Sequence, residues 1–174
     1  LLTTGVSEAL DVAIRALIDP GDEVLVPEPS YVAYQPVVMM AGGVYVPVPT
    51  TPEQSFMVSA EALETRITSA TKAILLAYPS NPTGAVMTRE ALERVAAVAL
   101  KHDLFVIADE LYDRLVYGVD HVCFPALPGM RERTVLLGGF SKAYAMTGWR
   151  LGYVAARPDL LEAIMKIHQY VMMS

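Results

Sequence analysis

Short runs of apolar residues alternate along this chain with longer stretches in which apolar positions recur at helical spacing. The clearest helix is predicted over Thr88–Lys101. Its apolar residues Leu92, Val95 and Ala99 recur at helical spacing, and the threonine at its start can cap it. Alternation of short apolar runs with helical patterns indicates βαβ units and a mostly parallel sheet.

The same pattern predicts the remaining elements. The predicted strands are Leu1–Thr3, Glu23–Pro27, Val44–Val48, Ala73–Ala77, Leu104–Ala108, Val135–Gly139 and Leu151–Ala155. The predicted helices are Ser7–Ile18, Tyr31–Met40, Ala60–Ile67, Thr88–Lys101 and Pro158–Val171. Strands without apolar and polar alternation are typical of a sheet that helices cover on both faces. We therefore expect a three-layer α/β/α fold around a mostly parallel seven-stranded sheet.

Composition narrows the class of protein. A chain of 174 residues with 53% hydrophobic content can build one sizeable core. No apolar run approaches the roughly 18 to 20 residues of a membrane span, and no leader segment is evident. The net charge of −6 comes without a basic stripe, which argues against nucleic acid as a partner. The single Cys123 fits a reducing compartment, so we expect a cytoplasmic protein, and the scattered histidines predict no metal site.

The most informative segment follows the apolar run Thr134–Phe140. It places Lys142 eight residues before Arg150, with hydroxyl and glycine residues between them. A lysine at the mouth of a buried strand is costly to desolvate unless it is paired or chemically used. The rigid fork of an arginine matches a phosphate group. Together they indicate a Schiff-base lysine and a phosphate-bearing carbonyl cofactor, which is the chemistry of pyridoxal 5′-phosphate.

Other polar groups also follow predicted strands. In open parallel sheets, ligands bind at the carboxyl ends of the strands. The groups at these ends are Gly5, Val6 and Ser7 after the first strand, Tyr31 after the second, Asn81 after Ala73–Ala77, Asp109 after Leu104–Ala108 and Lys142 after Val135–Gly139. The fold therefore predicts that they converge on one site.

Five segments in order resemble the signatures of the fold-type I aminotransferases, the class I/II family that includes aspartate aminotransferase. They are Thr4–Ala9, Pro29–Tyr34, Asn81–Gly84, Asp109–Tyr112 and Ser141–Arg150. The resemblance covers nearly the whole chain. It implies a pyridoxal-phosphate-dependent aminotransferase that moves an amino group between an amino acid and a 2-oxo acid.

The resemblance implies roles for the residues around the cofactor ring. Lys142 would form the Schiff base and move the α-proton, while Asp109 would pair with the pyridine nitrogen and sustain its charge. Tyr112 and Asn81 would lie at the 3-oxygen, and Tyr31 would stack on the ring. The structural alternatives are a turn cap for Asp109 and a plain Asn-Pro turn for Asn81.

Phosphate is expected at the start of the first helix. Gly5 permits close approach of the backbone, and the N–H groups of Val6 and Ser7 face the anion. The hydroxyl of Ser7 either adds a contact or caps the helix. Arg150 completes the phosphate site.

One position departs from the family pattern. Many members have a serine or threonine three residues before the lysine, whereas this chain has Gly139, so that Ser141 substitutes or the phosphate has one bond fewer. We assign Tyr34, Tyr117 and Tyr144 to packing.

Family members are longer than this chain, so we expect residues 1–174 to form a partial cofactor-binding large domain. An N-terminal segment and a C-terminal small domain would complete it, and the full-length protein would be a homodimer. Substrate choice stays open, because the arginine that binds the substrate carboxylate belongs to the small domain. Two alternatives stay open: a C–S (β) lyase or synthase of the same fold, and a cofactor-sensing domain of a transcription regulator.

Overall fold

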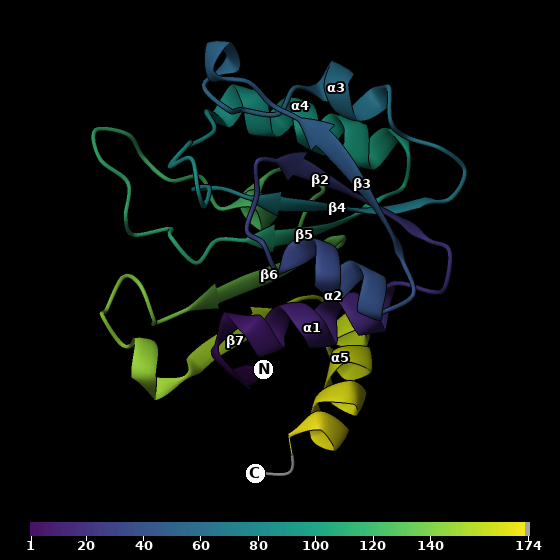
Figure 1. Ribbon diagram of the computed structural model, residues 1–174, viewed down its shortest axis with the longest axis vertical. Helices are drawn as coiled ribbons and strands as arrows, with labels where there is room; N and C mark the ends of the chain where they lie inside the picture. The colour runs from purple at the N-terminus through teal and green to yellow at the C-terminus, as the bar shows by residue number, and fades with distance from the viewer. Residues whose placement is uncertain (173–174) are drawn as a thin grey trace.

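A seven-stranded sheet forms the centre of the computed structural model, which describes residues 1–172, and helices cover both of its faces (Figure 1). The strands are β1 (Leu2–Thr4), β2 (Glu23–Glu28), β3 (Val44–Pro49), β4 (Thr71–Ala77), β5 (Phe105–Asp109), β6 (Thr134–Gly139) and β7 (Leu151–Ala155). The helices are α1 (Gly5–Leu17), α2 (Tyr34–Met40), α3 (Ala60–Glu64), α4 (Arg89–Lys101) and α5 (Pro158–Val171). The predicted three-layer, mostly parallel fold is confirmed, while the last two residues of the predicted domain lie outside the described ones.

The order and direction of the strands determine which residues meet at one edge of the sheet. The order is β1-β7-β6-β5-β4-β2-β3, and only β7 runs antiparallel to its neighbours. The start of β7 therefore lies at the same edge as the ends of the parallel strands, where the arrowheads of β4, β5 and β6 point in Figure 1. Residues that precede β7 thus meet residues that follow β1, β4, β5 and β6.

Alternate residues of the inner strands enter two separate cores. Val24 and Leu75 pack in the core beneath α1, α2 and α5, whereas Leu25 and Ile74 pack in the core beneath α3 and α4. Both sides of the inner strands are consequently buried, which explains why their sequences are continuously apolar rather than alternating.

The predicted start of α4 is confirmed. Thr88 is its N-cap, and the side-chain oxygen of Thr88 accepts a hydrogen bond from the backbone N–H of Ala91 at 3.2 Å. α2 begins three residues later than predicted, because Tyr31 starts a turn whose carbonyl accepts the N–H of Tyr34 at 3.1 Å. The capping threonine therefore predicted the start of α4 correctly, whereas the turn at Tyr31 makes α2 shorter than predicted.

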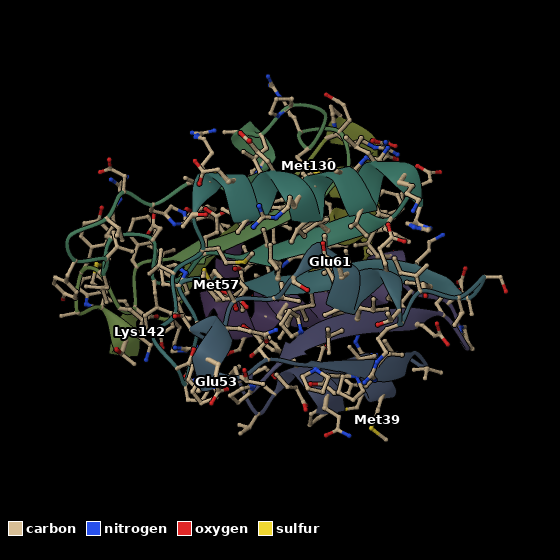
Figure 2. All side chains as sticks on the ribbon, turned by 90° about the horizontal axis from the view of Figure 1, so that it is seen from above. Met39, Glu53, Met57, Glu61, Met130 and Lys142 are labelled. Carbon is tan, nitrogen blue, oxygen red and sulfur yellow. The ribbon has the colours of Figure 1, made fainter. Side chains whose placement is uncertain are left out.

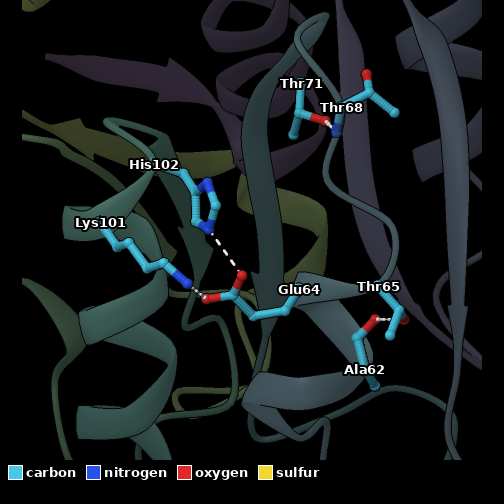
Figure 3. Close-up of polar contacts among 7 residues, drawn as sticks. All are labelled: Ala62, Glu64, Thr65, Thr68, Thr71, Lys101 and His102. Carbon is cyan, nitrogen blue, oxygen red and sulfur yellow. Dashed lines mark hydrogen bonds and ion pairs between the residues drawn. The ribbon is translucent and has the colours of Figure 1, made fainter.

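α3 ends at Glu64 rather than at the predicted Ile67. The hydroxyl of Thr65 donates to the carbonyl of Ala62 at 2.9 Å, which competes with continuation of the helix (Figure 3). Glu64 accepts hydrogen bonds from Lys101 at 2.9 Å and contacts His102 Nε2 at 2.8 Å, so the end of α3 is tied to the end of α4 (Figure 3).

The helices of residues 1–172 include none that is both long enough and apolar enough to cross a membrane. The longest of them, α5, has 14 residues and a single fully buried side chain, that of Ile164.

Candidate active site

A cavity of about 210 Å³ opens at the edge where the parallel strands end. Its wall consists of Val6, Ser7, Leu10, Tyr31, Tyr34, Ala77, Pro79, Asn81, Asp109, Leu111, Tyr112, Ser141, Lys142, Thr147 and Arg150. Nine of the ten predicted site residues line this cavity, and the tenth, Gly5, lies directly against the Arg150 side chain. The fold therefore brings these residues together at one cavity, as predicted.

Lys142 enters the cavity from the segment that follows β6. Figure 2 shows it on the side of the sheet where the parallel strands end. Its side chain is exposed, and no acidic group of residues 1–172 lies within ion-pair distance of it. The expectation that this lysine carries a desolvation cost is wrong, because the cavity is open to solvent. The amine is thus accessible to a molecule that enters the cavity.

Asp109 is the last residue of β5 and is buried. Its Oδ2 accepts a hydrogen bond from the Tyr34 hydroxyl at 2.9 Å, and its Oδ1 accepts one from the backbone N–H of Leu111 at 3.2 Å. Burial raises the pKa of Asp109 above its usual range in spite of these two bonds. A cationic group in the cavity would stabilise the ionised carboxylate. The turn-cap alternative also holds, since one oxygen caps the turn while the residue lines the cavity.

Tyr34 is a site residue that the sequence analysis missed. It is 3% exposed, and its pKa is raised by burial and by the neighbouring Asp109. A buried phenol needs a hydrogen-bonding partner, and that requirement was the available signal. Packing is confirmed for the ring of Tyr34, which belongs to the core beneath α1, α2 and α5, but it is the wrong assignment for Tyr117, which is 85% exposed. Tyr144 is exposed as well, although its ring lies 5.6 Å from the ring of Phe140.

Three of the predicted ring-contacting residues stand around Asp109. Tyr31 meets Tyr34 edge to face, with ring centroids 5.6 Å apart. Asn81 and Tyr112 are half-buried in the cavity wall, and the pKa of Tyr112 is raised by burial and then by Asp109. The wall therefore offers an aromatic face, an amide and a phenol beside a buried carboxyl.

The first turn of α1 and the side chain of Arg150 form a cradle for an anion. α1 begins at Gly5, so the N–H groups of its first turn have no partner within the helix. Gly5 has φ of +75°, and a Cβ there would lie 2.5 Å from Arg150 Nη2. Arg150 Nη1 donates to the carbonyl of Thr147 at 3.1 Å, which holds the guanidinium over this turn. The N-cap is Thr4, so the capping alternative for Ser7 is wrong.

Gly139 has a packing reason for its departure from the family pattern. A Cβ at this position would lie 2.8 Å from Val6 Cγ2, so a serine or threonine would require Val6 to move. Ser141 is 7% exposed and lines the cavity near Lys142. The small residue therefore lets the first turn of α1 pack against the end of β6.

These groups fit pyridoxal 5′-phosphate. The free N–H groups and the guanidinium suit a phosphate, the buried carboxyl suits a ring nitrogen, and the accessible amine suits an aldehyde. Residues 1–172 contain no group of three or more His, Cys, Asp and Glu side chains placed to hold a metal ion.

Comparison with known proteins also indicates an aminotransferase. The family model described as aminotransferase class I and II matches residues 1–174. YugH of Bacillus subtilis (strain 168) is 53% identical over 173 residues, which are 99% of this chain and 45% of that protein. The aspartate aminotransferase of Pyrococcus abyssi is 42% identical over 171 residues, covering 98% of this chain and 44% of that protein.

A solved structure agrees in fold as well. The crystal structure of the aromatic aminotransferase from Pyrococcus horikoshii OT3 superposes with a TM-score of 0.95 at 42% identity, covering 98% of this chain and 46% of that chain. The chain thus spans less than half the length of the relatives that it matches.

Proposed function

This chain belongs to the family of class I and II aminotransferases, whose cofactor is pyridoxal 5′-phosphate, and from that membership we propose that it is the cofactor-binding large domain of a transaminase. The observation that carries the proposal is the meeting of Lys142, Asp109 and Arg150 at one cavity. An amine, a buried carboxyl and a phosphate-matching guanidinium are the three groups that this cofactor requires of a protein. The substrates are an amino acid and a 2-oxo acid.

Bound pyridoxal phosphate supplies an aldehyde that condenses with amines and a ring that accepts the electron pair left at the α-carbon. Lys142 would hold the cofactor through its amine and would be the group that moves the proton at the substrate α-carbon. Asp109 keeps a proton on the ring nitrogen. Burial raises the pKa of Asp109 because its ionised form is poorly solvated there. A cationic ring nitrogen beside it would therefore stabilise the ionised form.

The remaining groups hold the cofactor. The N–H groups of Val6 and Ser7 and the guanidinium of Arg150 bind the phosphate, with charge-assisted hydrogen bonds of about 1.5–3 kcal/mol each. Tyr31 would stack on the ring, and Asn81 and Tyr112 would donate hydrogen bonds to the ring oxygen. Ser141 adds a contact on the phosphate side. The presence of all seven residues in the cavity wall supports these roles.

We also propose that the full-length protein is a homodimer in the cytoplasm. Apolar side chains at the surface support the dimer, since Val32, Met39 and Met40 are 82%, 60% and 61% exposed. Side chains of this kind gain free energy when a partner covers them. The free thiol of Cys123 supports a reducing compartment.

The choice of amino acid substrate depends on residues outside this cavity wall. Relatives named for aspartate and for aromatic amino acids match this chain at the same 42% identity. The cavity residues described above contact the cofactor, which is common to both reactions. Specificity is therefore proposed to come from the part of the protein that covers the cavity.

Product analysis of the full-length protein tests the reaction. The protein is loaded with pyridoxal phosphate and treated with one amino acid at a time, without an acceptor. A transaminase gives one 2-oxo acid per site and leaves the cofactor as its amine. Release of ammonia with repeated turnover would show a lyase, and binding of the cofactor without any product would favour a sensing domain.

A further inference from the structure

A carboxylate–histidine contact joins the two ends of the described chain beside the phosphate cradle. Glu8 lies in the first turn of α1, and His168 lies in the last turn of α5. His168 Nδ1 is 2.6 Å from Glu8 Oε1, although 160 residues separate the two. The side chains are 7% and 19% exposed, so this is a largely desolvated pair rather than a surface contact.

The other oxygen of Glu8 holds the turn that opens α1. Glu8 Oε2 accepts the backbone N–H of Thr4, the N-cap residue, whose own side chain makes no capping bond. The adjoining Thr3 hydroxyl donates to the carbonyl of Gly5 at 3.0 Å. The side chains of Glu8 and Thr3 therefore hold the backbone of Thr4 and Gly5.

His168 determines where the Glu8 carboxylate lies. A carboxylate only accepts hydrogen bonds, so Nδ1 of His168 carries the proton of this contact. Without that donor, one oxygen of a buried carboxylate would lose its partner, and the side chain would gain by turning toward water. Turning would also release the N–H of Thr4 and loosen the turn against which Arg150 packs.

We propose that Glu8 and His168 are positioning residues for the phosphate cradle, an inference that rests on the proposed binding of pyridoxal phosphate. Neither residue is in the cavity wall, whereas Val6 and Ser7 of the same turn are. The pair therefore acts on the phosphate end of the cofactor through the backbone. It leaves Lys142 and Asp109, which bind the other end, unaffected.

The test compares two ligands that differ only in the phosphate. Dissociation constants of pyridoxal 5′-phosphate and of pyridoxal are measured by absorbance on the full-length protein and its variants. His168→Gln and His168→Asn are the informative pair, because the asparagine amide nitrogen reaches the place of Nδ1 and the glutamine amide nitrogen reaches that of Nε2. His102→Asn is the matched control, because its amide nitrogen does not reach the place of Nε2 and the half-buried contact with Glu64 at 2.8 Å is lost.

We expect His168→Gln to bind pyridoxal phosphate about tenfold more weakly, the size of one hydrogen bond to a charged group, and to bind pyridoxal as the wild type does. His168→Asn should restore most of the loss, and His102→Asn should change neither constant. An equal loss for both ligands, or no loss, would overturn the proposal. Failure of the wild type to bind either ligand would refute the cofactor assignment itself.

Discussion

The hydroxyl of Tyr34 donates a hydrogen bond to Oδ2 of Asp109 across 2.9 Å, within the wall of the cavity. The bond joins the start of α2 to the end of β5, and both residues are buried. It supplies the ionised carboxylate with a partner that the solvent cannot provide.

Replacing Tyr34 by phenylalanine should destabilise the cofactor-free protein by about 1–3 kcal/mol, because a buried carboxyl loses a hydrogen bond and the ring keeps its packing. Urea denaturation followed by circular dichroism measures the loss. Tyr117→Phe is the control, since that tyrosine is 85% exposed. Equal stabilities of Tyr34→Phe and the control would contradict the structural importance of this bond.

Replacing Asp109 by asparagine should make the cofactor-free protein more stable near neutral pH. Burial raises the folded-state pKa of Asp109, so the folded protein binds its proton more tightly than the unfolded chain does. Wild-type stability therefore falls as pH rises from the ordinary aspartate range, about 4, through the raised pKa. The substitution removes this fall.

Thermal melts of the wild type and Asp109→Asn without cofactor, at acidic and neutral pH, measure the difference. The advantage of the variant should appear at neutral pH and shrink on acidification, while its affinity for pyridoxal phosphate should be lower. A variant that is less stable at neutral pH than the wild type would show that the carboxylate contributes to stability even without the cofactor.

Gly5→Ala should weaken cofactor binding through its phosphate. The residue has φ of +75°, and the new Cβ would lie 2.5 Å from Arg150 Nη2, so the guanidinium must leave the cradle. Gly21→Ala is a matched control with φ of +95° and no atom within 4 Å of the Cβ. Both changes should cost about 1–2 kcal/mol of backbone strain in urea denaturation, but only Gly5→Ala should raise the dissociation constant. A similar dissociation constant for the two would argue against the cradle.

Glu110→Ala should be strongly destabilising. Its Oε1 accepts the N–H of Phe124 at 2.7 Å and its Oε2 contacts His121 Nε2 at 2.7 Å, and the side chain is 8% exposed. Loss of one member of a buried pair costs about 3–5 kcal/mol. The control is Glu64→Ala, which removes the contacts of a more exposed carboxylate with Lys101 and His102 and should have a much smaller effect in the same urea titration. A small effect at Glu110 would mean that water replaces the carboxylate.

The sequence predicted every strand and α-helix of residues 1–172, with shifts at the ends, because the inner strands are apolar throughout and Thr88 caps α4, but it did not predict the three short 3₁₀ helices. It also predicted the residues that meet at the cavity, since the rule that ligands lie at strand ends requires only strand positions. The Tyr34–Asp109 and Glu8–His168 contacts could not be predicted in this way. They span 75 and 160 residues and depend on how α2 and α5 pack on the sheet, which no local pattern encodes.

The identity of the Lys142 adduct tests the central claim most directly. The full-length protein is mixed with pyridoxal 5′-phosphate, reduced with borohydride, and analysed by intact mass and peptide mapping, with Lys142→Ala in parallel. We predict one reduced adduct, on Lys142, that is absent from the variant. An adduct on another lysine, or none in a folded wild-type protein, would contradict the assignment of this cavity to the cofactor.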